Sequence, residues 1–224
     1  MKAIFALLTA LSIINSEVSI GKILQTKGYI KKTNINCQEK SCSKTQTISP
    51  GERIITSKDS AAQILLNDGT AIVIFEKSDI IISRIKLRER DNPTEIYIER
   101  GKIKVIQNNS FTEASLIIKT PVAVIKSVKS EISIATGACE SAVFVYTGEA
   151  GVASNFPSVD RAYIVKAGYE TFIKKENPPS RPVEVKKLLQ GSWIGRTVIS
   201  QDNCRVKIYN RETSIVDWPF IHND

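Results

Sequence analysis

Residues 49–75, SPGERIITSKDSAAQILLNDGTAIVIF, form the segment that decides the fold. A Pro-Gly turn lies at its start, and two apolar, β-rich runs lie on either side of Asp68-Gly69. This pattern is typical of a β-hairpin, because Asp and Gly tolerate the positive φ that both central residues of a type I′ turn require. The segment therefore predicts extended strands joined by short turns.

The two-residue turn predicts a register for this hairpin. One face would carry three opposed pairs, Leu66 with Ala71, Ile64 with Val73, and Ala62 with Phe75. The other face would carry Gln63, Leu65, Ile72 and Ile74. The expected result is one dry face and one mixed face.

Length and composition are those of an ordinary globular protein. The chain has 224 residues, 42% hydrophobic and 24% charged, so it can bury a core of its own. Its single histidine is His222, near the end of the sequence. Zinc sites built on histidine, Ser-His-Asp triads and Cys-His dyads are therefore not expected inside the fold. We predict no catalytic residue, no cofactor and no metal site.

Residues 1–16 predict export. Met1-Lys2 is followed by the apolar run AIFALLTALSII, which is shorter than the roughly 20 residues of a membrane-spanning helix. We interpret residues 1–16 as a signal peptide that is cleaved after Ser16, with cleavage after Ser12 as the alternative. The expected location is the periplasm or the cell exterior, and an integral membrane protein is not expected.

Export makes the four cysteines informative, because an oxidising compartment preserves disulfides. Cys37 and Cys42 flank QEKS in a polar loop, which favours a local bridge and leaves Cys139 for Cys204. Three pairings are formally open. A four-cysteine metal site is the rival reading, but only the first pair has the usual ligand spacing.

The rest of the chain continues the pattern of short strands. Residues 17–47 predict a strand and the cysteine-bracketed loop, and residues 48–176 predict a β domain in which Pro121 separates two strands. Residues 177–224 predict a stiff proline-rich connector, a short helix over residues 183–190 and a docked C-terminal extension. The predicted fold is all-β, either a solenoid-like roll of short strands or an irregular β-sandwich with a small C-terminal extension.

Basic side chains alternate with apolar ones on two predicted strands. In residues 80–90, Ile81, Ile85 and Leu87 would face the core while the basic residues face water. The candidate binding face comprises Arg84, Lys86, Arg88, Arg90, Lys102 and Lys104.

This face suits the phosphate or carboxylate groups of an anionic envelope polymer or an envelope protein. A solvated face that keeps a sheet edge from aggregating would show the same alternation. The net charge of +8, from 31 basic and 23 acidic residues, fits both readings. Nucleic acid is not an expected partner, because aromatic residues for base stacking are not interleaved and the chain is expected to be exported.

Two Ser-x-x-Lys matches, Ser41 to Lys44 and Ser83 to Lys86, raise the alternative of an exported hydrolase. In a strand, Ser83 and Lys86 would point to opposite faces, and the companion motifs of that enzyme class do not occur. The sequence therefore favours a protein without catalytic activity.

Three aspartates and three aromatic residues also have two readings. Asp59, Asp68 and Asp79 fit turns better than a calcium loop, because their spacing lacks the loop signature. Trp193, Trp218 and Phe220 are interpreted as core anchors of the C-terminal extension instead of an exposed aromatic strip.

The opening segment resembles the core of the FecR domain, an exported bacterial β module. The matching motifs are GERIIT at residues 51–56 and SAAQILLNDGT at residues 60–70. Further motifs are ERGKI at 99–103, KTPVAV at 119–124, VYTGEAGV at 145–152 and VKAGYET at 165–171. The resemblance covers residues 48–175. At residues 128–134 the chain reads VKSEISI where the family usually has a Gly-Thr pair, so the local bend is expected to differ.

This resemblance implies a β module without catalytic residues. In the family, the module is best known in proteins that relay a receptor signal to a sigma factor, where a cytoplasmic domain and a membrane helix precede it. Here only the signal-like segment precedes residue 17. We therefore expect an exported envelope protein that binds a protein or a polymer, with a periplasmic regulator of a receptor-to-sigma-factor pathway as the alternative. The oligomeric state and the ligand are not predicted.

Overall fold

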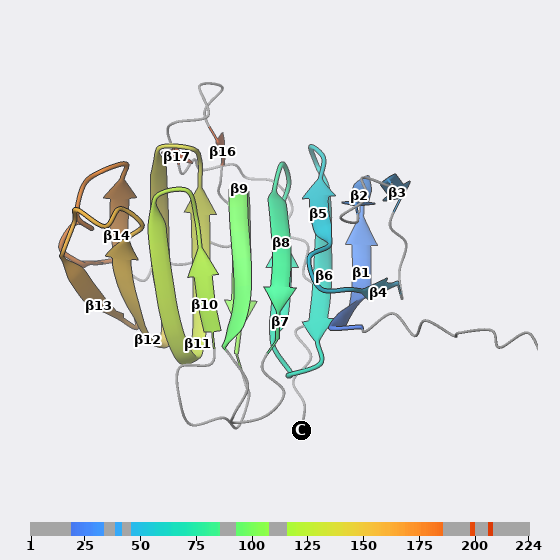
Figure 1. Ribbon diagram of the computed structural model, residues 1–224, viewed down its shortest axis with the longest axis horizontal. Helices are drawn as coiled ribbons and strands as arrows, with labels where there is room; N and C mark the ends of the chain where they lie inside the picture. Colours follow the sequence, from blue (N-terminus) through green and yellow to red (C-terminus); the bar gives the residue numbers. More distant parts are fainter. Residues whose placement is uncertain are drawn as a thin grey trace, which may run out of the picture.

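The computed structural model describes residues 19–33, 39–41, 46–85, 93–107, 116–185, 198–199 and 206–207. All regular elements among them are β-strands (Figure 1), which confirms the predicted all-β class. The strands are β1 (Gly21–Lys27), β2 (Ile30–Thr33), β3 (Glu39–Ser41), β4 (Thr47–Ile48), β5 (Arg53–Thr56), β6 (Ala61–Leu66), β7 (Ala71–Ile74), β8 (Asp79–Arg84), β9 (Thr94–Ile106), β10 (Leu116–Lys119), β11 (Ala123–Thr136), β12 (Glu140–Ser154), β13 (Ala162–Lys166), β14 (Tyr169–Lys174), β15 (Val183–Glu184), β16 (Val198–Ile199) and β17 (Val206–Lys207).

Strands β1–β15 form one continuous sheet that folds over on itself into two layers. The first layer runs β4, β1, β6, β7, the end of β9, the end of β11, the start of β12, β14 and β15. The second layer runs β3, β2, β5, β8, the start of β9, β10, the start of β11, the end of β12 and β13. Because β9, β11 and β12 belong to both layers, the molecule is a flattened roll with the layers facing each other.

Special backbone conformations mark the places where these three strands change layer. Gly101 in β9 has φ 106°, Lys129 in β11 has φ 44°, and Gly148 in β12 has φ 74°. Such values disfavour most side chains, and glycine adopts them without steric cost. At β9 the Ser78 hydroxyl lies against the bend, where it accepts a hydrogen bond from Lys102 N (2.9 Å) and donates one to Lys102 O (3.1 Å).

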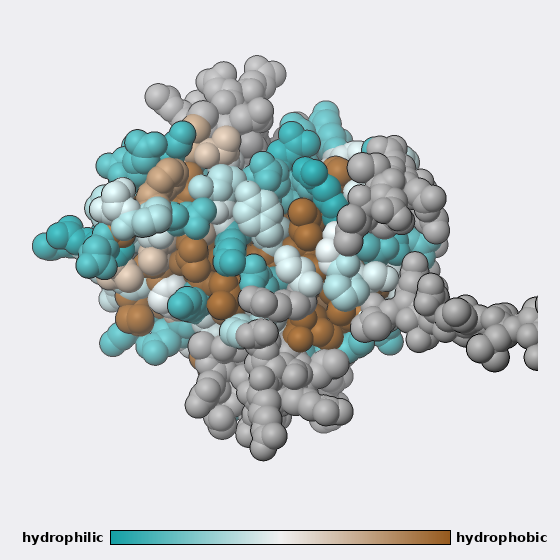
Figure 2. Space-filling view, viewed as in Figure 1, coloured by the Kyte–Doolittle hydropathy of each residue, from teal (hydrophilic) through white to brown (hydrophobic). Residues whose placement is uncertain are grey.

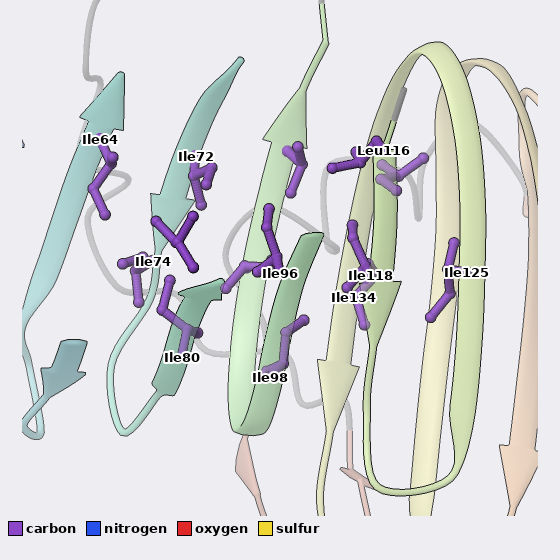
Figure 3. Close-up of a cluster of buried hydrophobic side chains, with 14 of the residues drawn as sticks. Ile64, Ile72, Ile74, Ile80, Ile96, Ile98, Leu116, Ile118, Ile125 and Ile134 are labelled. Atoms are coloured by element: carbon purple, nitrogen blue, oxygen red, sulfur yellow. The ribbon is translucent and has the colours of Figure 1, made fainter. Parts of the chain in front are cut away.

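β-Branched side chains fill the space between the layers. In the first layer, paired residues form the buried row Ile23, Ile64, Ile72, Val105, Ile132 and Val145. In the second layer the corresponding row is Ile82, Ile96, Ile118, Ile125 and Val152. Figure 3 shows side chains of both rows in one cluster. Cross-strand pairs of this kind are the main stabilising contacts of a sheet.

The β6–β7 hairpin exists, but its predicted register is wrong by one residue. The structure pairs Ile64 with Ile72 and Leu65 with Ala71, around a three-residue loop at 67–69. Only Gly69 in this loop has positive φ, at 85°. This is the geometry of a type I turn followed by a left-handed residue, and it differs from the predicted two-residue turn. Ile72 and Ile74 therefore face the core, and Phe75 is only half-buried.

Strand β8 also differs from its prediction. Ile80 and Ile82 are the fully buried residues, whereas Ile81, which was expected in the core, faces outward and is half-buried. A register shift between Ile82 and Arg84 interrupts the alternation, and Ile85 then packs against the core. A single alternation cannot run through such a bulge.

The last described segments bear on the C-terminal prediction. Val183–Glu184 forms β15 and pairs with β14, so the predicted helix does not begin there. Residues 186–190, the rest of that prediction, lie outside the described residues. Strand β17 lies against β12, far from it in sequence.

Candidate binding surfaces

Lys102 and Lys104 project from β9 on the outward side of the first layer, yet both are buried. Their exposed fractions are 1% and 3%, so the expectation that they face water is wrong. The Lys102 ammonium lies 4.8 Å from the centroid of the Phe75 ring, and the Lys104 ammonium lies 4.5 Å from that of Tyr146. These are cation–π contacts in a largely desolvated setting.

An acidic residue completes this cluster. Lys104 Nζ lies 2.5 Å from Glu131 Oε1, and the Ser133 hydroxyl donates to Tyr146 Oη at 3.3 Å. Burial, together with the like charge of Lys104, lowers the pKa of Lys102 to about 7. Burial raises the pKa of Tyr146 above its ordinary value. In the sequence alone, neither Glu131 nor Tyr146 stands out as a partner of these lysines.

A second apolar cluster continues this outward side of the first layer. Ala135, Ala142, Phe144 and Val185 are buried there, and Tyr146 and Phe172 pack against them. The Phe144 and Tyr146 rings meet edge to face, with centroids 4.6 Å apart. The part of this outward side that β9, β11, β12 and β14 form is thus a second packed region and not a solvated face.

Of the other predicted basic residues, the structure describes only the backbone of Arg84. Arg84 ends β8, which belongs to the second layer, so its backbone lies on the opposite layer from Lys102 and Lys104. Its side chain, and Lys86, Arg88 and Arg90, lie outside the described residues. Among the described residues, the two buried lysines and the backbone of Arg84 thus lie on different layers, and the rest of the predicted face stays a prediction.

The outward side of the second layer carries charges in compensated pairs. The Arg53 guanidinium donates two hydrogen bonds of 2.6 Å to the Asp79 carboxylate, and this contact raises the pKa of Arg53. Lys119 Nζ lies 2.8 Å from Glu95 Oε1. Tyr97 lies between these pairs in the sheet, and its pKa is raised by burial and by the nearby Glu99.

Half-buried apolar residues separate the charged pairs of this second-layer face. They include Ile55, Ile81, Ile117 and Val124. Figure 2, which is viewed from the side of β8 and β10, shows hydrophobic and hydrophilic residues interleaved over short distances. Such a mixed surface resembles the composition of many non-obligate protein interfaces.

One end of the roll leaves a strand edge open. Among the described strands, β13 pairs with β12 alone and ends the second layer (Figure 1), and β15, which pairs with β14, ends the first layer. Each of these edge strands carries an exposed apolar residue, with Ile164 57% and Val183 59% exposed. The alternation of β13 predicts a strand, but its position at an edge follows only from the topology.

The predicted disulfide residues are described at one position. Cys139 is disulfide-bonded and lies at the turn before β12. Cys37, Cys42 and Cys204 lie outside the described residues, so the pairing stays a prediction.

The aspartates singled out in the sequence have structural roles. Asp68 accepts a hydrogen bond from Thr70 N (2.8 Å) within the hairpin turn, as predicted, and another from Thr94 Oγ1 (2.5 Å) at the start of β9. Asp59 lies in a turn with φ 56°. Asp79 instead begins β8 and pairs with Arg53. Among the described residues, no group of three or more His, Cys, Asp or Glu side chains is arranged to hold a metal ion.

The remaining candidates are mostly outside the described part of the chain. Ser83 is exposed in β8, whereas Lys86 and the Ser-x-x-Lys match at 41–44 are not described beyond the backbone of Ser41. Trp193, Trp218 and Phe220 are also outside it. Within the described ranges, no helix is long and apolar enough to cross a membrane.

A protein-family model matches the middle of the chain. The family model described as FecR protein matches residues 52–151. Residues 52–151 are similar to a FecR domain. This domain runs from the start of β5 into β12 and so contains all three places where a strand passes between the layers.

Two solved structures have a similar fold. Two crystal structures from Parabacteroides distasonis ATCC 8503, of a protein provisionally described as an anti-sigma factor, align with a TM-score of 0.50 at 14% and 15% identity. Each alignment covers 65% of this chain and 65% or 66% of the other chain. At this identity the likeness concerns the fold. No curated protein matches the chain.

Proposed function

We propose that this chain is a non-enzymatic regulator that binds a protein partner through its FecR domain, in a pathway that links an envelope receptor to a sigma factor. The observation that carries the proposal is the FecR match over residues 52–151. The description of the similar Parabacteroides proteins as anti-sigma factors points the same way.

The geometry is compatible with binding in place of catalysis. The outward side of the second layer combines paired charges with half-buried isoleucine and tyrosine side chains, which suits a protein surface. The described residues with shifted pKa values, Lys102 among them, are held in contacts that stabilise the fold.

The proposed location is the periplasm or the cell exterior, and it rests on the signal-like residues 1–16. The test is mass spectrometry of the protein purified from a periplasmic fraction. A mature N-terminus at Glu17 supports export, whereas an intact Met1 in the cytoplasmic fraction contradicts it.

The regulatory role is tested by deleting the gene and measuring transcripts. Genes under alternative sigma factors should change at least several-fold in the deletion strain and return to the parental level on complementation. Complementation should fail with a chain that lacks residues 48–176. Unchanged transcripts under envelope stress in the deletion strain would contradict a regulatory role.

An anionic envelope polymer is the second candidate ligand, and the net charge of +8 favours it. The burial of Lys102 and Lys104 removes two of the six residues proposed for that surface. Cosedimentation with peptidoglycan and with lipopolysaccharide vesicles tests it, with a variant that replaces Arg84, Lys86, Arg88 and Arg90 by glutamate as the comparison. Binding that the variant retains would show that these residues are not the site.

A further inference from the structure

Strand β13 presents unused backbone groups at one end of the roll. Ala167 N donates to Gly148 O at 3.1 Å, which fixes the phase of the antiparallel pairing between β13 and β12. Because N–H and C=O groups alternate in direction along such a strand, those of Tyr163 and Val165 point to β12. Those of Ala162, Ile164 and Lys166 point to the open edge, where β13 pairs with no other described strand.

The side chains of this edge leave its centre uncovered. Ile164 lies opposite Gly151 of β12, which has no side chain to shield it. A Cβ atom built on Gly151 would lie 3.7 Å from Ile164 Cδ1. Ile164 stays 57% exposed. Natural sheets usually protect edges with charges, bulges or prolines, and here the charges lie at the two ends, in Arg161 and Lys166.

We propose that the β13 edge binds an extended segment of a partner protein, which adds to the second layer as a further strand. The outward backbone groups of Ala162, Ile164 and Lys166 would supply the hydrogen bonds. An apolar residue of the segment would cover Ile164, and acidic residues would lie near Arg161 and Lys166. This inference rests on the proposed function in that the partner is a protein.

Charge favours a partner segment over a second copy of this chain. Two copies paired along β13 would bring Arg161 and Lys166 of both chains into one short contact, where like charges repel. Lys126, which is exposed on the strand beyond Gly151, adds a third positive charge on the same side. Asp160 lies next to Arg161 and Glu149 lies opposite Lys166, so they offset two of these three charges. Each copy keeps one net positive charge on this side, which repels a second copy and attracts an acidic segment.

The test uses the full chain and a synthetic peptide, Glu-Thr-Val-Thr-Val-Glu with blocked ends, followed by NMR. We expect the amide signals of Ala162, Ile164 and Lys166 to shift and to gain protection from exchange. A peptide with lysine in place of both glutamates should bind at least tenfold more weakly.

Two substitutions at one residue separate backbone from side-chain effects. Ile164→Pro removes the outward N–H without removing a hydrogen bond to β12, so it should weaken peptide binding at least tenfold and leave the fold intact. Ile164→Ala keeps the N–H and should weaken binding less. If Ile164→Pro lowers the melting temperature markedly, the double variant Arg161→Glu, Lys166→Glu takes its place as the test. This double variant should bind the lysine peptide more tightly than the glutamate peptide, the reverse of the native chain.

Several results would overturn the proposal. These are peptide-induced shifts away from β13, equal binding of both peptides by the native chain, or protection of the same amides without peptide in a chain that sediments as a dimer. In the deletion strain, full complementation by both Ile164 variants would contradict the edge site while leaving the regulatory role in place. An unchanged transcript profile on deletion would contradict the regulatory role and leave the peptide experiment to decide the edge.

Discussion

Single residues hold the strands where they change layer, and Gly101 shows this most directly. A Cβ atom at Gly101 would lie 2.3 Å from Ser78 Cα, and its φ of 106° excludes most other residues. At Gly69, φ is 85° but no atom lies within 4 Å of the corresponding Cβ position. An alanine at either position would therefore have a strained backbone, but only at position 101 would its Cβ atom also clash with a neighbour.

We predict that Gly101→Ala lowers the free energy of unfolding by about 3 kcal/mol, since backbone strain and overpacking add. Gly69→Ala, the matched control, should cost about 1 kcal/mol from strain alone. Urea unfolding followed by circular dichroism measures both. Equal losses in the two variants would show that the contact with Ser78 does not constrain the bend.

Lys102 makes stability depend on pH. Its folded pKa of about 7 lies below the ordinary 10.5, so between these values the unfolded chain binds a proton that the folded chain does not. The free energy of unfolding therefore rises as pH increases from 7 towards 10, by up to about 1.4 kcal/mol per pH unit. Below pH 7, the cost of burying the charged Lys102 is present in full.

The test compares urea unfolding at pH 7 and pH 9 for the native chain, Lys102→Met and the exposed Lys126→Met. The native chain and Lys126→Met should gain stability between these pH values, and Lys102→Met should lose most of that gain. An unchanged slope in Lys102→Met would mean that Lys102 is charged in the folded protein at pH 9.

At the scale of an element, the β6–β7 hairpin depends on one side chain that links it to β9. Asp68 accepts a hydrogen bond from the turn at Thr70 N and another from Thr94 Oγ1 at the start of β9. Both donors are buried, with Thr70 and Thr94 fully inaccessible. The turn and the second layer are therefore coupled through Asp68.

Asp68→Ala should cost about 2 kcal/mol, because it removes the acceptor of two buried hydrogen bonds. Asp68→Asn keeps an acceptor oxygen and should lose less than half of that. Chemical denaturation of both variants and of Thr94→Val provides the comparison. If Asp68→Ala and Thr94→Val together cost the sum of their separate losses, the two residues are not coupled.

For the whole molecule, the three strands shared by the layers should form its most stable part. Strands β9, β11 and β12 are paired on both sides along most of their length, whereas β3, β13 and β15 end the layers. Native-state hydrogen exchange should show the slowest amides in β11 and β12, and fast exchange at Ala162, Ile164 and Lys166. Strong protection of these three amides in a monomer would mean that the β13 edge is covered.

The sequence by itself determined most strands and turns and the resemblance to the FecR domain, because alternation and turn residues act over a few neighbouring positions. Pro121 separating β10 from β11 and Asp68 in a turn are examples. The sequence did not determine the hairpin register, because Asp68-Gly69 fits both a two-residue and a three-residue loop and only packing against β9 selects one.

Only the tertiary structure decided which outward faces meet water. Lys102 and Lys104 alternate with core residues as solvated lysines would, but Phe75, Glu131 and Tyr146, which are distant in the sequence, pack against them. The open edge at β13 is equally invisible in the sequence. Burial and edge position depend on contacts between residues far apart in the chain, and a pattern of period two contains no information about them.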